Sequence, residues 1–103
     1  MTKKRTLAVD FDGTLFDNAT QQFMPGARDM VAKLRSRGWF VLVHSCNKPS
    51  WIRQCLREHG VVVDGVWGES PADCNHKPVA DVYLDDCGMK FVAWDEALLK
   101  ELS

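Results

Sequence analysis

The stretch that decides the fold is LAVDFDGTLFDN, residues 7–18. Three apolar residues lead directly to Asp10 and Asp12, and a glycine and a threonine follow at once. An apolar strand of this kind is typical of a parallel sheet whose two faces are both covered. The two carboxylates at its end repel each other, and a buried charge without a partner lowers stability. The pattern therefore predicts a buried strand at residues 5–11 that ends in a site needing paired carboxylates.

Strand and helix patterns alternate along the whole 103-residue chain. The expected helices span residues 25–38, 48–60 and 95–102, and the further expected strands span residues 39–45, 61–67, 80–86 and 90–94. Gly38 and Gly60 stand where helix C-terminal caps belong, and Ser50 or Asn47 is expected to cap the second helix. The alternation predicts one α/β domain over residues 1–103, a three-layer Rossmann-like fold around a parallel sheet.

The composition is that of an ordinary globular protein, with 46% hydrophobic and 26% charged residues and a net charge of −1. A nearly neutral chain argues against the broad basic surface of a duplex-DNA binder, so nucleic acid is expected only as a substrate. No apolar run approaches the ~20 residues that a membrane span needs, so we expect no membrane partner and a cytoplasmic location. The four cysteines are widely spaced and are expected to be free thiols.

Polar side chains occupy the ends of three expected strands and the segment before the last of them: Asp10, Asp12, Ser45, Asn47, Lys77, Asp85 and Asp86. The carboxyl ends of parallel strands meet at one edge of a sheet, where ligands bind. Mg²⁺ would relieve the repulsion among the carboxylates, because it takes oxygen ligands and often a substrate phosphate. Lys77 adds positive charge, and Ser45 supplies a hydroxyl donor. Such an edge suits phosphoryl transfer through an aspartyl-phosphate.

Four segments in order resemble the signatures of the haloacid dehalogenase (HAD) superfamily, whose members are mostly Mg²⁺-dependent phosphatases. DFDGT at 10–14 resembles the first signature, and VLVHS at 41–45 resembles the second, a hydrophobic strand ending in Ser or Thr. Lys77 resembles the third, and VYLDD at 82–86 resembles the fourth, a strand ending in an acidic pair. The resemblance spans most of the chain and implies a HAD-like phosphatase.

The resemblance implies a role for each matching residue. Asp10 would be the nucleophile and a Mg²⁺ ligand. Asp12 would be the general acid and then the base, with its backbone carbonyl on the metal. Ser45 would bind the transferring phosphoryl group, and Thr14 would stabilise the turn that carries Asp12. Lys77 would orient Asp10 and neutralise phosphate charge.

The acidic pair would complete the metal site, with Asp86 as the direct ligand and Asp85 acting through metal-bound water. The assignment of these two could also be reversed. Lys77 precedes Asp85 by only eight residues, so the helix that many members have between them is missing here. Lys48, close to Ser45 in sequence, is therefore the alternative for the lysine role.

The gaps between the motifs leave no room for the cap domain that most such phosphatases carry. Residues 15–24 are expected to hold a short loop, and residues 46–76 a helix and a short strand. An open site would suit a nucleotide, a phosphate on a large substrate such as nucleic acid or protein, or a homo-oligomer whose partner subunit forms the lid. The expected substrate-binding residues are Thr14, Asn47, Lys48 and Arg53. Trp51 could stack on a base, although packing is the commoner role of a helix tryptophan.

Two other interpretations compete with this one. The first is a non-catalytic module that binds a phosphate or a phosphorylated partner on a HAD scaffold, and loss of Asp10 or Asp12 would be its expected mark. The second is a phosphorylatable signalling domain, whose acidic pair would belong on the first strand and whose acceptor on a central one, an order that this chain does not match. A zinc site built from Cys74 and His76 with Cys46 or Cys87 is not expected, because the spacing is not that of a CxxC knuckle. Both aspartates are present, so the catalytic interpretation is preferred.

Overall fold

The computed structural model describes residues 5–45, 47–69, 80–84, 94 and 96–102. Within these residues, four parallel strands form the central sheet in the order β5-β4-β1-β6. The strands of this sheet are β1 (Arg5–Asp10), β4 (Trp39–His44), β5 (Gly65–Val66) and β6 (Val82–Leu84). The helices are α1 (Ala27–Ser36), α2 (Pro49–Glu58) and α3 (Glu96–Glu101). Strands β2 (Phe16–Asp17) and β3 (Gln22–Phe23) form a small antiparallel hairpin.

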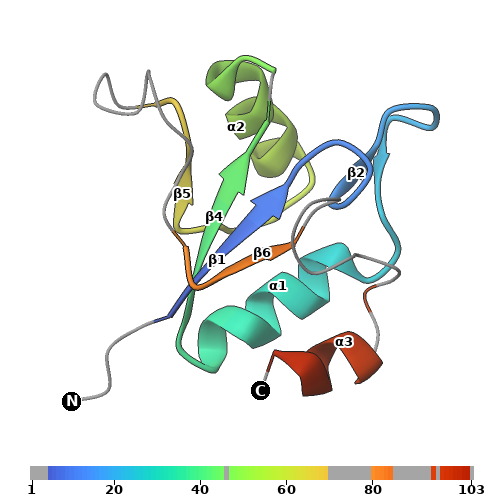
Figure 1. Ribbon diagram of the computed structural model, residues 1–103. Coiled ribbons are helices and arrows are strands. Elements are labelled where there is room, and N and C mark those ends of the chain that lie inside the picture. The colour runs from blue at the N-terminus through green and yellow to red at the C-terminus, as the bar shows by residue number, and fades with distance from the viewer. Residues whose placement is uncertain (1–4, 46, 70–79, 85–93, 95, 103) are drawn as a thin grey trace.

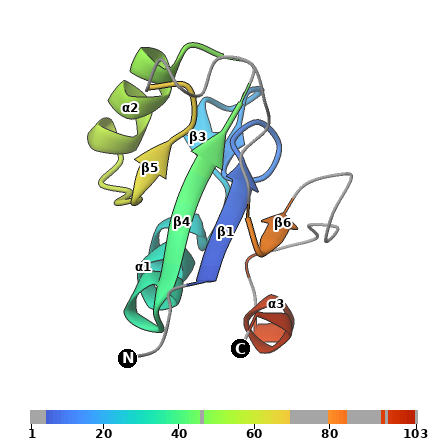
Figure 2. The ribbon, with the colours of Figure 1, turned by 60° about the vertical axis from the view of Figure 1, so that its left-hand side comes forward.

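The helices connect neighbouring strands of the sheet. The chain passes from β1 through α1 to β4 and from β4 through α2 to β5, so both crossovers move in the same direction along the sheet. Right-handed crossovers place two such helices on one face, as Figures 1 and 2 show for α1 and α2. After α3 the chain lies beside the start of β4, where the indole Nε1 of Trp39 donates to the carbonyl of Leu102 at 3.0 Å. The expected α/β fold with a Rossmann-like parallel sheet is confirmed.

Much of the core packs against β1 and β4, the two strands that lead to the first two motifs. Leu7, Ala8 and Val9 of β1 are fully buried, which confirms that this strand is covered on both faces. In β4 the buried residues alternate with more exposed ones, and Phe40 is 37% exposed. Four apolar residues of α1 form the buried stripe that its sequence spacing predicts: Ala27, Met30, Val31 and Leu34. Val31 and Leu34 are almost fully buried, and burial of a side chain of this size contributes about 1.5–3 kcal/mol to folding.

Three local expectations differ from the structure. Neither Asn47 nor Ser50 caps α2; the capping position is occupied by Lys48, which makes no side-chain capping bond and precedes Pro49. Residues 15–24 form the β2–β3 hairpin rather than a plain loop. The strand expected at 61–67 is shorter in the structure. Gly65 and Val66 alone form β5, and they pair with Leu42 and Val43 of β4. The strand expected at 90–94 lies outside the described residues except for Trp94.

The C-terminal end of α1 follows the glycine capping rule used for the sequence prediction. Gly38 directly follows the capping residue of α1 and has a φ of 95°, a left-handed conformation that confirms its predicted capping role.

None of the helices in the described part of the chain has the length and apolar character that a membrane-spanning helix needs.

One ion pair ties α1 to the segment that enters β5. The guanidinium of Arg35 donates to both carboxylate oxygens of Asp64, at 3.2 and 3.0 Å. Oδ2 of Asp64 also accepts the backbone N–H of Val41 at 2.8 Å. The hydrogen bond to Asp64 raises the pKa of Arg35. The pair therefore fixes α1, β4 and the start of β5 relative to one another.

The buried thiol of Cys55 leads to a testable expectation about reactivity. Burial raises the pKa of Cys55, and the nearby Glu58 carboxylate adds to the shift. Since the thiolate is the reactive form, we expect iodoacetamide near pH 8 to alkylate Cys55 much more slowly in the folded protein than in denaturant. Mass spectrometry of the peptide that contains Cys55 would measure both rates. Equal rates would contradict the buried position.

Candidate active site at the carboxyl edge of the sheet

The parallel register of β1 and β4 brings the first two motifs to the same level. Asp10, the last residue of β1, lies opposite His44, the last residue of β4. The N–H of Phe11 donates to the carbonyl of His44 at 3.1 Å, so the two strands remain joined one residue beyond the sheet. Ser45 follows His44 directly. Asp10 and Ser45 are both half-buried at this edge, where a parallel sheet binds its ligands.

A tight turn then brings the chain back over the end of β1. The carbonyl of Phe11 accepts the N–H groups of Leu15 at 3.1 Å and Phe16 at 2.9 Å. Gly13 adopts a φ of 79°, which favours glycine at this position of the turn. Thr14 is only 4% exposed, and its carbonyl accepts the indole N–H of Trp94 at 2.9 Å. Thr14 therefore supports the turn and presents very little surface to a substrate.

The carboxylate of Asp12 is the centre of a hydrogen-bond cluster. The hydroxyl of Ser45 donates to Oδ2 at 2.8 Å. The side-chain amide of Asn47 donates to Oδ1 at 3.1 Å and to Oδ2 at 2.9 Å. The side-chain amide of Asn18, from the turn of the hairpin, donates to Oδ1 at 2.7 Å. Donors from three separate side chains reach its two oxygens, so these contacts fix the orientation of Asp12.

The hydroxyl of Ser45 is itself held in place by the chain that follows it. The backbone N–H of Asn47 donates to Oγ of Ser45 at 3.0 Å. This bond occupies the acceptor side of the oxygen and leaves its hydrogen available to an anion. The side chains of Ser45 and Asn47 thus both donate to the carboxyl group of Asp12.

The other two expected substrate-binding residues lie on and next to α2. Lys48 is exposed at the start of the helix, next to Asn47. Arg53 donates to both carboxylate oxygens of Glu69, at 2.8 and 3.0 Å, and this pairing raises the pKa of Arg53. The structure therefore directs Arg53 toward Glu69 and does not join it to the Asp12 cluster.

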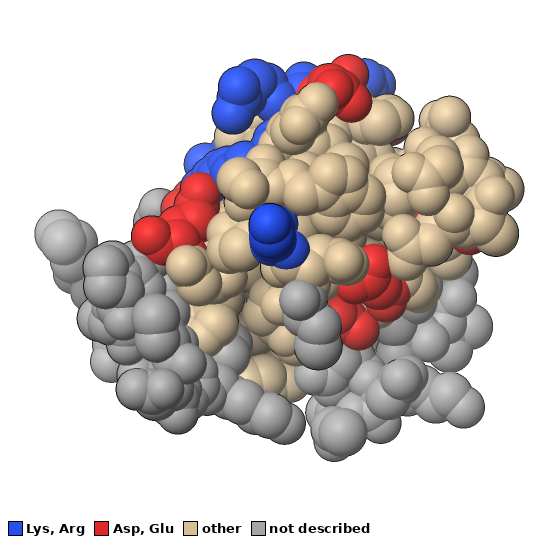
Figure 3. All heavy atoms as spheres, turned by 90° about the horizontal axis from the view of Figure 1, so that it is seen from above, with Lys and Arg blue, Asp and Glu red and all other residues tan. Residues whose placement is uncertain are grey.

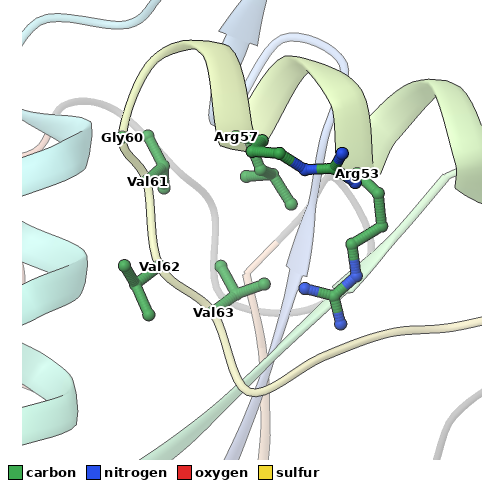
Figure 4. Close-up of a pocket in the computed structure, with 7 residues that line it drawn as sticks. Arg53, Arg57, Gly60, Val61, Val62 and Val63 are labelled. Carbon is green, nitrogen blue, oxygen red and sulfur yellow. The ribbon is translucent and has the colours of Figure 1, made fainter.

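Arg53 also lines a shallow pocket on α2 and the loop that follows it. Figure 4 shows Arg53 and Arg57 on the helix side and valines of the loop opposite them. The pocket has a volume of about 300 Å³ and is lined by Arg53, Leu56, Arg57, Gly60, Val61, Val62 and Val63. The hydrogen bonds to Asp12 described above come from none of these residues.

Trp51 packs inward rather than toward a substrate. Its ring meets the ring of Phe11 edge to face at a centroid distance of 5.6 Å and that of Phe16 at 5.9 Å. These contacts attach it to the core, in agreement with the packing role. Figure 3 looks down on the carboxyl edge. Among the described residues, most basic side chains lie along one margin of this face, one lies apart near its middle, and acidic side chains lie at separate places.

Several expected site residues lie outside the described residues. These are Lys77, Asp85 and Asp86 of the third and fourth motifs, together with Cys46, Cys74, His76 and Cys87. Within the part of the chain that the structure describes, no group of three or more His, Cys, Asp or Glu side chains is arranged to hold a metal ion.

Two functional contacts had no clear signal in the sequence. Asn18 reaches Asp12 because the hairpin folds back over the turn, and its sequence position fits a simple polar turn equally well. Glu69 pairs with Arg53 across 16 residues, between α2 and the segment after β5. A hairpin prediction over residues 16–23 would have placed Asn18 on a turn, but the residue that this turn meets depends on contacts with distant parts of the chain.

The comparisons with known proteins concern the fold. No family model and no curated protein matches this chain. One similar solved structure is described as the structure of a conserved protein from Bacteroides thetaiotaomicron. It has a TM-score of 0.72 and 20% sequence identity, and the match covers 97% of this chain and 89% of that one. At this identity the likeness shows a shared fold.

Proposed function

We propose that this protein is a Mg²⁺-dependent phosphohydrolase of the HAD type, with a three-layer core and no cap, that acts through an aspartyl-phosphate. The observation that supports this most strongly is the pair of hydrogen bonds from Ser45 and Asn47 to Asp12. These bonds join the first and second motifs at the carboxyl edge, next to the strand end that carries Asp10. A carboxylate pair beside anion donors is the arrangement that the reaction requires.

The donors around Asp12 would form the phosphate cradle. In the structure they donate to a carboxylate, which shows that they are oriented toward an anion. A phosphate monoester carries more negative charge and three strong acceptor oxygens, so it would compete with Asp12 for Ser45 and Asn47. Binding would then free Oδ2 of Asp12 for proton transfer.

The first step forms the covalent intermediate. A carboxylate oxygen of Asp10 attacks phosphorus, and the bond from phosphorus to the leaving oxygen breaks. Asp12 gives its proton to that oxygen, which leaves as the alcohol. Ser45 and Asn47 hold the equatorial oxygens of the transferring group.

The second step returns the enzyme to its starting state. Asp12, now ionised, accepts a proton from a water molecule, whose oxygen attacks phosphorus. The bond between Asp10 and phosphorus breaks, inorganic phosphate is released, and Asp10 is again a carboxylate. Asp12 holds a proton again, ready for the next leaving group.

The donor atoms at this edge fit a magnesium ion. The carboxylate of Asp10 and the backbone carbonyl of Asp12 are hard oxygen ligands, the type that Mg²⁺ prefers, and Asp86 with Asp85 would complete the set. When bound, the ion would offset the charge of the phosphate. We propose Lys77 as the lysine that orients Asp10, with the exposed Lys48 as the alternative.

We infer the substrate class from the short connection between β1 and α1. There the described chain forms only the β2–β3 hairpin. A site with no larger insertion at this place suits a nucleotide or a phosphate carried by nucleic acid or protein. Alternatively, a second subunit of a homo-oligomer would cover it. The identity of the phosphorylated partner follows from the experiment below.

A phosphatase panel with and without Mg²⁺ tests the proposal. It would include p-nitrophenyl phosphate, nucleotides, sugar phosphates and oligonucleotides phosphorylated at the 5′ or 3′ end. We expect phosphate release that requires Mg²⁺ and stops when the ion is chelated. Tight binding of a phosphorylated ligand without any turnover would instead support the non-catalytic binding module.

A further inference from the structure

We propose that Asn18 is the positioning residue that sets the orientation of the general acid Asp12. This inference rests on the proposed function. It concerns a residue outside all four sequence motifs, on the turn of the β2–β3 hairpin.

The geometry separates Asn18 from the other two donors to Asp12. Ser45 and Asn47 come from the end of β4 and would turn to the phosphate when substrate binds. Asn18 comes from the hairpin and donates to Oδ1 at 2.7 Å, the shortest of the contacts to this carboxylate. When the phosphate draws Ser45 and Asn47 away, Asn18 is, among the donors that the structure describes, the one that remains on Asp12.

The contact with Asn18 lies on one oxygen of the carboxylate. The amide of Asn18 donates to Oδ1 at 2.7 Å, whereas the hydroxyl of Ser45 donates to Oδ2 at 2.8 Å. Asn18 therefore holds the carboxylate by Oδ1 and leaves Oδ2 toward the side on which the phosphate would bind.

The hairpin holds Asn18 in place by contacts of its own. The carbonyl of Asn18 accepts the side-chain amide of Gln21 at 2.8 Å. The carboxylate of Asp17 accepts the N–H of Ala19 at 2.9 Å, which closes the turn on the other side. Asn18 itself is exposed, so its replacement removes the contact with Asp12 without opening the core.

The test compares Asn18→Ala with Thr20→Ala, an exposed residue of the same turn. The substrates are p-nitrophenyl phosphate, whose leaving group needs little protonation, and an alkyl phosphate monoester, whose leaving group needs a proton. For Asn18→Ala we expect kcat to fall about tenfold or more with the alkyl ester and less than about twofold with the aryl ester. KM should stay unchanged for both, because Asn18 contacts Asp12 and not the substrate. Thr20→Ala should match the wild type.

An equal loss with both esters, or no loss, would overturn the positioning role while leaving the phosphatase proposal intact. A wild-type protein that turned over neither ester would instead refute the proposed function. The contact itself is tested without turnover by the side-chain amide resonances in a ¹⁵N NMR spectrum. In Asp12→Ala the resonance of Asn18 should shift and that of Gln54, whose amide donates to Glu58 on α2, should not. An unmoved Asn18 resonance would refute the inference.

Discussion

Replacement of Asp10 by asparagine should lower Mg²⁺-dependent phosphate release on the order of 10⁴-fold, which corresponds to about 5.5 kcal/mol of transition-state stabilisation. The amide has the shape of the carboxylate but cannot attack phosphorus to give an acyl phosphate. Because Asp10 is half-buried at the end of β1 and the two side chains are isosteric, the fold should be retained.

Two measurements separate this result from a general loss of structure. Rapid acid quenching followed by mass spectrometry should find a phosphoryl group on the wild-type peptide that contains Asp10 and none in Asp10→Asn. The matched control is Asp29→Asn, an aspartate on α1 whose side chain is 85% exposed, and its activity should equal that of the wild type. Equal turnover by wild type and Asp10→Asn would end the proposed mechanism.

The parts of this fold that the sequence predicted are those set by local periodicity. The run Leu7–Val9 is apolar at every position, and a strand with this pattern can only be accommodated where both faces are covered. The stripe on α1 and the left-handed Gly38 follow equally local rules. Once the strands are parallel, their carboxyl ends share an edge, so the meeting of Asp12 with Ser45 was also predictable.

The incorrect prediction for the N-terminal cap of α2 shows that a contact distant in sequence can outweigh a local preference. Asn47 is a favourable capping residue by type, but its side-chain amide donates to Asp12, which lies 35 residues away in sequence. Pro49 meanwhile begins α2 without needing an N–H partner, so the helix forms without a side-chain cap. The contacts of Asn18 and Glu69 likewise depend on how separate segments come together, which no local pattern encodes.

Near the site, we expect Phe11 to be the side chain whose removal lowers the free energy of unfolding most. It is fully buried and stacks on Phe16 at a centroid distance of 5.1 Å, with edge-to-face contacts to Phe23 at 5.9 Å and Trp51 at 5.6 Å. Phe11→Ala would leave a cavity and should lower the free energy of unfolding by about 3–5 kcal/mol. This is a large share of the roughly 5–15 kcal/mol that stabilises a typical domain.

Chemical denaturation of Phe11→Ala and Phe40→Ala would measure this difference. Phe40 undergoes the same truncation but is 37% exposed on β4, so it should lose much less stability. Phe11 lies between Asp10 and Asp12, and its ring holds this part of the chain against the core through the rings of Phe16 and Phe23. Phe11→Ala should therefore also lose turnover per folded molecule under conditions in which it remains native. A loss of stability no greater than that of Phe40→Ala would show that the aromatic cluster does not anchor the site to the core.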